Sequence, residues 1–287
     1  MYNANANHIE LRQQRDFSAL IGTGFEFVRQ NWKTLYRPLV FVCLPVYIGA
    51  SLLFGNFFRT VLAGQASGNL GAGMGSMLVG YVAMALAGLL INIMVYEYMR
   101  GYMLNQGLAP GTGELLREVR GQFFSYLALG LLAGAITVAG MVFFVLPGIW
   151  LAIVFSVAFP LLAFERASVG DCVGRSFKLV KGHWWHSFGL VLVLAMLIGF
   201  LGYVIYLPFM LFMGFGTLSG MADPSTAGSD LGWMMTLFML VAGAVNVLLQ
   251  PLLLVPLGLN ALSLMEEKEG RGLLQRVEEM PGPGTPA

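Results

Sequence analysis

The chain has 287 residues, of which 57% are hydrophobic and 11% are charged, and its formal net charge at pH 7 is +1. A soluble domain carries about 25% charged residues, so this composition, with a mean hydropathy of +0.74, excludes a soluble globular protein. The near balance of basic and acidic residues gives no sign of a nucleic-acid partner.

The N-terminal segment, residues 1–16, is polar and has no apolar stretch of signal-peptide length, so we expect the first membrane span to act as the insertion signal. The alternating pattern of a membrane β-barrel is absent. Six apolar runs approach or exceed the roughly 20 residues that a transmembrane helix needs. These predicted spans are Leu35–Phe57, Gly73–Tyr96, Phe124–Leu146, Gly148–Phe164, Phe188–Phe212 and Leu231–Leu254, with Met265 as the furthest end of the last.

The predicted fold is therefore all-α, a polytopic six-helix transmembrane bundle that forms one membrane domain over residues 17–265. Residues 266–287 are predicted to be a cytoplasmic tail whose Pro- and Gly-rich end is disordered. With the N-terminus placed in the cytoplasm, 15 of the 16 Lys and Arg residues fall on the cytoplasmic side and Arg59 alone falls outside. The positive-inside rule then predicts a multi-pass protein of the bacterial inner (plasma) membrane with both termini cytoplasmic.

A short motif recurs before each pair of spans. Gly22–Tyr36 aligns with Gly174–Phe188, and a third copy covers Gly113–Phe124, with the shared pattern G-x-x-(F/L)-x-x-V-(R/K)-x-x-(W/F). This predicts three parallel repeats, each an amphipathic helix followed by a transmembrane hairpin. The alternative is a chance match in a glycine-rich chain.

The repeated segments have apolar residues three to four positions apart, which is typical of a helix with one apolar face. We expect residues 23–32 and 174–184 to be helical, with that face on the bilayer interface or on neighbouring helices. Aromatic and basic residues at the ends of these segments favour headgroup depth. The predicted interfacial anchors are Trp32, Phe123, Trp184, Trp185 and Lys181.

The stretch HWWH raises the alternative of a metal site. His183 and His186 are three residues apart and share a helix face, but a zinc site needs at least one more ligand. Glu97 and Glu165 are the only candidates that the sequence offers for it. The sequence therefore favours histidines that face the headgroups, and we expect no metal and no cofactor.

Charged residues near the spans are confined to their ends. Glu97 and Arg100 end the second span, and Glu165 and Arg166 follow the fourth. They are interpreted as ordinary charges at the cytoplasmic boundary. The alternative is that Glu97 and Glu165 converge with an Arg or Lys of a repeat helix in a small polar site.

Three strongly polar residues fall inside the predicted spans, namely Asn92, Asn246 and Gln250. Asn246 and Gln250 are four residues apart and share a helix face. One hypothesis is that the three residues line a substrate cavity. The other is that they make hydrogen bonds between helices, as is common in membrane bundles.

Residues 159–194, FPLLAFERASVGDCVGRSFKLVKGHWWHSFGLVLVL, resemble a group of bacterial and archaeal six-span membrane proteins. That group includes the membrane domain of some glycerophosphodiester phosphodiesterases. The residues that carry the resemblance are Pro160, Glu165, Ser176, Phe177, Lys181, Gly182 and Trp185. Residues 15–45 and 264–280 look like the Bacteroidetes type of this group. The catalytic α/β barrel of the phosphodiesterases has no counterpart here, so the resemblance implies the fold and no active-site residues.

Two classes of function remain open. The sequence favours transport or handling of a lipid-like or small amphiphilic molecule within the bundle. The alternative is a non-enzymatic accessory or scaffold protein that docks a protein partner or shapes the membrane. An intramembrane enzyme ranks third, because no catalytic motif occurs. The expected partners are the lipid bilayer, a lipid or small amphiphile, and a protein.

Overall fold

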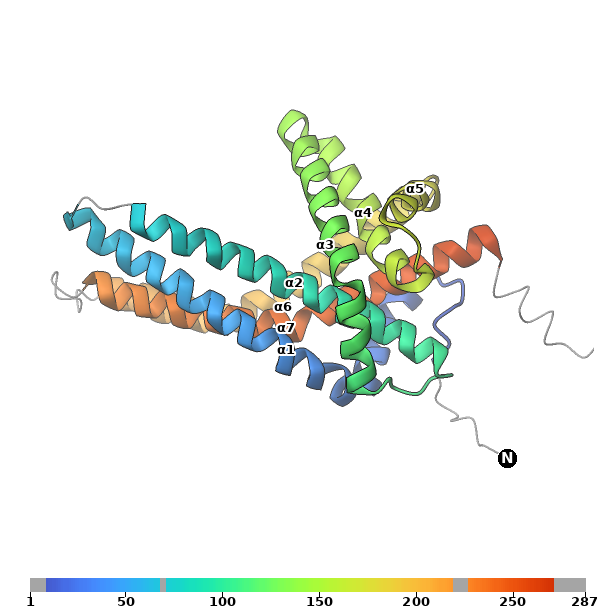
Figure 1. Cartoon of the computed structure of the whole chain (residues 1–287), viewed down its shortest axis with the longest axis horizontal. Helices are drawn as coiled ribbons and strands as arrows, with labels where there is room; N and C mark the ends of the chain where they lie inside the picture. The colour runs from blue at the N-terminus through green and yellow to red at the C-terminus, as the bar shows by residue number, and fades with distance from the viewer. Residues whose placement is uncertain (1–8, 68–70, 219–226, 271–287) are drawn as a thin grey trace, which may run out of the picture. The chain divides into compact units, whose positions relative to one another are not determined.

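The computed structural model describes residues 9–67, 71–218 and 227–270, and within these ranges it contains seven α-helices and no strand (Figure 1). The helices are α1 (Phe17–Ser67), α2 (Gly71–Leu104), α3 (Thr112–Phe143), α4 (Val145–Glu165), α5 (Val169–Val180), α6 (Trp184–Leu218) and α7 (Ala227–Glu269). The predicted all-α class is confirmed.

Six of these helices, all except α5, are long and apolar enough to cross a membrane, and each contains most or all of one predicted span. The predicted division between the third and fourth spans is misplaced by a few residues. The helix breaks at Phe144, whose extended backbone (φ −155°, ψ 128°) both ends α3 and begins α4. The last helix continues past Met265 to Glu269. The predicted disorder at the C-terminal end falls on residues outside the described ranges.

The chain divides into two compact units, and residues 33–92 and 195–251 form one of them. In this unit, parts of α1, α2, α6 and α7 pack through aromatic rings and glycines. The rings of Phe54 and Tyr81 join α1 to α2 with centroids 4.9 Å apart. A Cβ added at Gly243 of α7 would lie 2.9 Å from Tyr47 of α1, so only glycine permits this close approach.

The other unit consists of residues up to 32, residues 93–194 and residues from 252 onward. In Figure 1, α3 and α4 form a hairpin, and α5 lies against α4. The ring of Phe177 on α5 contacts the rings of Trp150 and Phe155 on α4, with centroids 5.4 and 6.2 Å away. The buried face of α5 therefore packs on protein and not only on lipid.

The ends of α5 have local causes. Ser168 caps its first turn, because its hydroxyl accepts a hydrogen bond from the Asp171 backbone N–H at 3.2 Å and donates one to the Asp171 carboxylate at 2.6 Å. The helix ends at Val180, and Gly182 then takes a left-handed φ of 92° that favours glycine.

These ends bear on the predicted repeat. The expectation of a helix over residues 23–32 is confirmed, since they belong to α1. The expectation over residues 174–184 is wrong beyond Val180, because the turn at Lys181–His183 separates α5 from α6. The copies at Gly22–Tyr36 and Gly113–Phe124 run continuously into their spans within α1 and α3, whereas the copy at Gly174–Phe188 is broken by this turn.

Candidate functional site

A partly buried group of four charged residues, which we call the charge cluster, joins α2, α3 and the end of α4. It consists of Glu97, Arg100, Glu118 and Arg166. The Glu97 side chain is 0% exposed, and Arg166 donates a hydrogen bond of 2.8 Å to its Oε2. Arg166 also pairs with Glu118. The nearest carboxylate oxygens to Arg100 are 3.8 and 3.9 Å away, too far for a hydrogen bond.

The position of Arg166 follows from the end of α4. This residue takes the left-handed conformation (φ 53°, ψ 27°) that closes a helix C-terminus, a position that glycine usually fills. Its charge-assisted hydrogen bonds to Glu97 on α2 and Glu118 on α3 hold the turn in place. With two carboxylates and two guanidinium groups, the cluster is balanced in charge and fastens three helices together.

A second group of ion pairs fixes α5 to the end of α7. Three consecutive residues, Glu267, Lys268 and Glu269, form what we call the α7 clamp. Glu269 pairs with Arg175 of α5, and Lys268 donates hydrogen bonds to the backbone carbonyls of Lys178 and Lys181, the latter at 2.8 Å. These contacts satisfy carbonyls at the C-terminus of α5 that the helix itself leaves open.

The alternative that Glu97 and Glu165 converge in one polar site can be compared with their ion pairs. Glu97 belongs to the charge cluster, whereas Glu165 pairs with Arg175 at 2.8 Å beside the α7 clamp. Glu165 thus meets an arginine of the motif copy at Gly174–Phe188, while the ion pairs of Glu97 and Glu165 belong to different groups. These ion pairs give no support to one shared polar site.

The two histidines of the HWWH stretch have protein contacts. His183 Nε2 lies 2.9 Å from a carboxylate oxygen of Glu267, and the His186 ring meets the edge of Phe17 with centroids 5.8 Å apart. Within the described part of the chain, no three His, Cys, Asp or Glu side chains are grouped to hold a metal. Burial raises the pKa of the Cys172 thiol on α5 to about 11, so this cysteine is protonated at neutral pH.

We expect replacement of both His183 and His186 by Gln to leave zinc content unchanged. The pair of His183 and Glu267 is partly exposed, so its loss costs at most about 1 kcal/mol of stability. Elemental analysis and thermal unfolding of the purified wild type, the double variant and the control Glu267→Gln check this. Stoichiometric zinc in the wild type that disappears in the double variant would show a metal site.

The polar residues inside the spans make local and interhelical hydrogen bonds. Asn246 of α7 accepts a 3.1 Å hydrogen bond from the Tyr47 hydroxyl of α1, as the interhelical hypothesis expects. Asn92 donates to the carbonyl of Gly88 in its own helix at 2.9 Å. Gln250 Oε1 is buried with no hydrogen-bond partner among the described residues. Asn260 of α7, which no sequence pattern singled out, is also buried, and its amide donates a 3.2 Å hydrogen bond to the Ser187 hydroxyl on α6.

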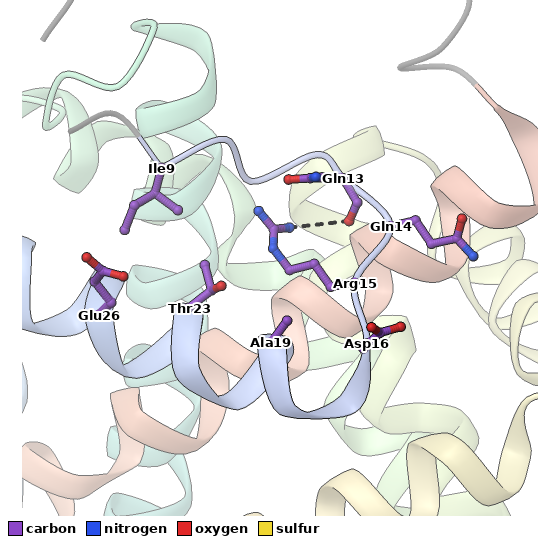
Figure 2. Close-up of a pocket in the computed structure, with 8 residues that line it drawn as sticks. All are labelled: Ile9, Gln13, Gln14, Arg15, Asp16, Ala19, Thr23 and Glu26. Carbon is purple, nitrogen blue, oxygen red and sulfur yellow. Dashed lines mark hydrogen bonds between the residues drawn. The ribbon is translucent and has the colours of Figure 1, made fainter. Parts of the chain in front are cut away.

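A polar pocket of about 670 Å³ lies where the N-terminal segment folds over the start of α1 (Figure 2). It is not lined by Asn92, Asn246 or Gln250. The Arg15 guanidinium at this pocket is bonded by its own segment, because it donates to the carbonyls of Leu11 at 2.9 Å and Gln13 at 3.3 Å. Its backbone N–H donates to Ser263 of α7 at 3.0 Å, which holds the segment in place.

The predicted interfacial anchors differ in exposure. Trp185 is exposed, whereas Trp184 is partly buried and stacks on Phe188 with ring centroids 5.0 Å apart. Trp32 and Lys181 are exposed, and Phe123 is partly buried. Their depth in the membrane stays a prediction.

One exposed face of α3 combines charge and apolar surface. Arg117, Phe124, Leu131 and Val138 are spaced by seven residues, two helical turns, and therefore lie along one side of the helix. Arg120 lies on the same face between Arg117 and Phe124, and Val142 extends the face beyond Val138. The apolar members of this α3 face are between 61% and 77% exposed. Within the described residues, neither Arg117 nor Arg120 forms an ion pair or a side-chain hydrogen bond.

Comparison with known proteins adds no assignment. No protein-family model matches the chain, no curated protein matches it, and no solved structure matches it. The resemblance to the membrane domain of glycerophosphodiester phosphodiesterases thus stays a prediction. The fold itself defines the class, which is a helical multi-pass membrane protein.

Proposed function

We propose that this protein is a non-enzymatic inner-membrane protein, with both termini cytoplasmic, that binds and handles an anionic lipid-like amphiphile. The observation that carries the proposal is the α3 face, where Arg117 and Arg120 lead into an exposed apolar stripe. The cytoplasmic orientation is supported by the distribution of Lys and Arg along the sequence.

The chemistry of the α3 face suits a molecule with an anionic head and apolar chains. A guanidinium binds a phosphate through two parallel hydrogen bonds, and both arginines have their donors available. The apolar stripe beyond them offers the acyl chains a surface of about the polarity of the bilayer. Because lipid tails are as apolar as leucine, the stripe contributes little to selectivity, which must come from the arginines.

The size of the effect can be estimated from the two charges. A basic residue near an anionic membrane surface contributes about 1 kcal/mol, so the two arginines together contribute about 2 kcal/mol. Since 1.4 kcal/mol corresponds to a factor of ten, this predicts a preference of roughly 30-fold for an anionic over a zwitterionic phospholipid.

The test is native mass spectrometry of the purified protein titrated with phosphatidylglycerol or phosphatidylethanolamine. We expect the wild type to bind phosphatidylglycerol preferentially and the double variant Arg117→Gln, Arg120→Gln to lose most of this preference. The matched control is Lys178→Gln, Lys181→Gln, which removes the same charge from exposed residues of the same unit. Equal loss in both variants, or no preference in the wild type, would contradict the α3 face as the lipid site.

A second candidate is a scaffold role, and the observation that favours it is the fixed position of α5. The α7 clamp holds this helix, while Asp171, Gly174 and Lys178 remain exposed along one face of it. A rigid polar edge of this kind suits the docking of a soluble protein. The same native spectra separate the two candidates, because a co-purifying protein supports docking and a bound phospholipid supports lipid handling.

A further inference from the structure

The corner between α3 and α4 has no polar side chain. We propose that it lies in the hydrocarbon of the membrane leaflet opposite the cytoplasm and not in water. Five consecutive residues, Val142, Phe143, Phe144, Val145 and Leu146, form this apolar corner. Each is between 64% and 78% exposed. The inference stands on the corner alone and does not depend on a lipid site at the arginines of α3.

The sequence around the apolar corner sets it apart from the other two connections that the topology predicts outside the cytoplasm. Residues 121–164 contain no Asp, Glu, Lys, Arg or His. The connection between α1 and α2 includes Asn69, and that between α6 and α7 includes Asp223. Leaving a large apolar side chain in water costs about 1.5–3 kcal/mol, so hydration of five such side chains would cost on the order of 10 kcal/mol.

The backbone of the apolar corner closes on itself at Phe144, whereas the N–H groups of Val145 and Leu146, in the first turn of α4, have no backbone acceptor among the described residues. Hydrocarbon offers no hydrogen bonds, so a segment within it must satisfy its own backbone groups. Phe144 is the one non-helical residue of the corner, and its N–H donates to the Gly140 carbonyl at 2.9 Å. The Phe144 carbonyl accepts from Gly148 at 3.3 Å, and Pro147 has no N–H to satisfy.

Glycines allow this tight closure. A Cβ added at Gly148 would lie 2.8 Å from the backbone nitrogen of Met141, and one added at Gly140 would lie 3.2 Å from the Gly148 Cα. The two helix backbones therefore meet directly, and no polar loop is needed to connect them. A direct, apolar connection of this kind exposes fewer polar groups to acyl chains than a polar loop would.

Because α3 is longer than the hydrocarbon core is thick, the apolar corner can stay in hydrocarbon only if α3 is tilted from the membrane normal. From Arg120 to Phe144 the helix rises about 36 Å at 1.5 Å per residue, whereas the hydrocarbon core is about 30 Å thick. If Arg120 stays at the cytoplasmic headgroups, the apolar corner remains in hydrocarbon when α3 tilts by about 35° or more. Tilts of up to about 40° occur in membrane helices.

Thiol labelling tests the depth of the corner. In a background of Cys43→Ala and Cys172→Ala, the variant Phe144→Cys is reconstituted into liposomes and exposed on both sides to a charged maleimide. The control is Asp223→Cys, at the connection between α6 and α7. Because the thiolate is the reactive form and hydrocarbon suppresses it, we expect Phe144→Cys to react at least tenfold more slowly than the control and equally fast in SDS. Equal rates in liposomes would overturn the proposal.

A spin label can distinguish whether lipid or another protein molecule surrounds the apolar corner. In liposomes that contain only this protein, a nitroxide at Phe144→Cys should collide readily with oxygen, which dissolves in hydrocarbon, and rarely with a charged nickel complex. Shielding from both reagents would mean that a second copy of the protein covers the corner. Access to the nickel complex would mean that the corner lies in water. Either result would contradict the proposal. If Phe144→Cys does not fold, Leu146→Cys serves in both measurements.

Discussion

Replacing Glu97 with Gln is expected to lower the free energy of unfolding by about 3 kcal/mol, because it leaves Arg166 without its fully buried anionic partner. Removing one member of a buried ion pair costs about 3–5 kcal/mol, and the 24% exposure of Arg166 and its second partner, Glu118, place the expected loss at the lower end. In a chain of this size such a loss lowers the midpoint of thermal unfolding by about 6–12 °C. The measurement is thermal unfolding of the detergent-purified protein by intrinsic fluorescence.

Two further variants make the result interpretable. Glu26→Gln removes a carboxylate from an exposed pair with Arg29 at 4.0 Å, and we expect it to change stability by less than about 1 kcal/mol. The double variant Glu97→Gln, Arg166→Gln removes both charges and should be less destabilised than the sum of the two single variants. Additive losses would show that the two residues do not stabilise the fold through each other.

Replacing Gly148 with Ala is expected to destabilise the α3–α4 hairpin, although alanine is the better helix former. The added methyl group would lie 2.2 Å from the Met141 Cγ and 2.8 Å from the Met141 backbone nitrogen. The side chain of Met141 can move, but the backbone contact requires the two helices to separate. Overpacking of this kind costs about 1–3 kcal/mol.

The matched control is Gly134→Ala on the exposed side of α3. A Cβ at Gly134 would have no neighbour within 4 Å, so the change should be neutral or should stabilise the helix by up to about 1 kcal/mol. Thermal unfolding and the yield of monodisperse protein after detergent extraction measure both variants. If Gly148→Ala is as stable as Gly134→Ala, the close approach at the apolar corner is not required for stability.

The spans could be predicted because hydropathy is a local property of the sequence. Each run of about 20 apolar residues must form a helix in a bilayer whatever its neighbours are. The end of α3 was less predictable, because residues 141–146 are uniformly apolar and mark no boundary. Phe144 ends the helix through its backbone conformation and the glycine contact that follows, neither of which hydropathy reports.

The positions of the charged residues at the ends of the spans could be predicted from the sequence, but their ion-pair partners could not. That Glu97 and Arg166 lie at the ends of spans follows from the cost of charge in hydrocarbon. Their pairing depends on how α2 and α4 meet, and the partners are 69 residues apart. Glu267 was missed as the partner of His183 because the C-terminal charges were counted only as part of a tail.

The α3 face could be predicted only in part from the sequence. The seven-residue spacing of Arg117, Phe124, Leu131 and Val138 is present in the sequence, but the other side of α3 is apolar as well. Which side is exposed becomes clear only from packing, since Val119, Tyr126 and Leu129 are buried in the protein. A helix with apolar residues all round cannot be oriented from its own periodicity.

The α7 clamp also sets an order for the maturation of the chain during synthesis. Arg175 precedes its partner Glu269 by 94 residues. At a synthesis rate of about 5–20 residues per second, α5 is complete roughly 5–20 s before the residues that hold its end exist. During that interval the insertion machinery or the lipid headgroups must accommodate the charges of α5. Completion of the last helix, and not the emergence of α5 from the ribosome, is therefore the step that commits this part of the molecule to its final arrangement.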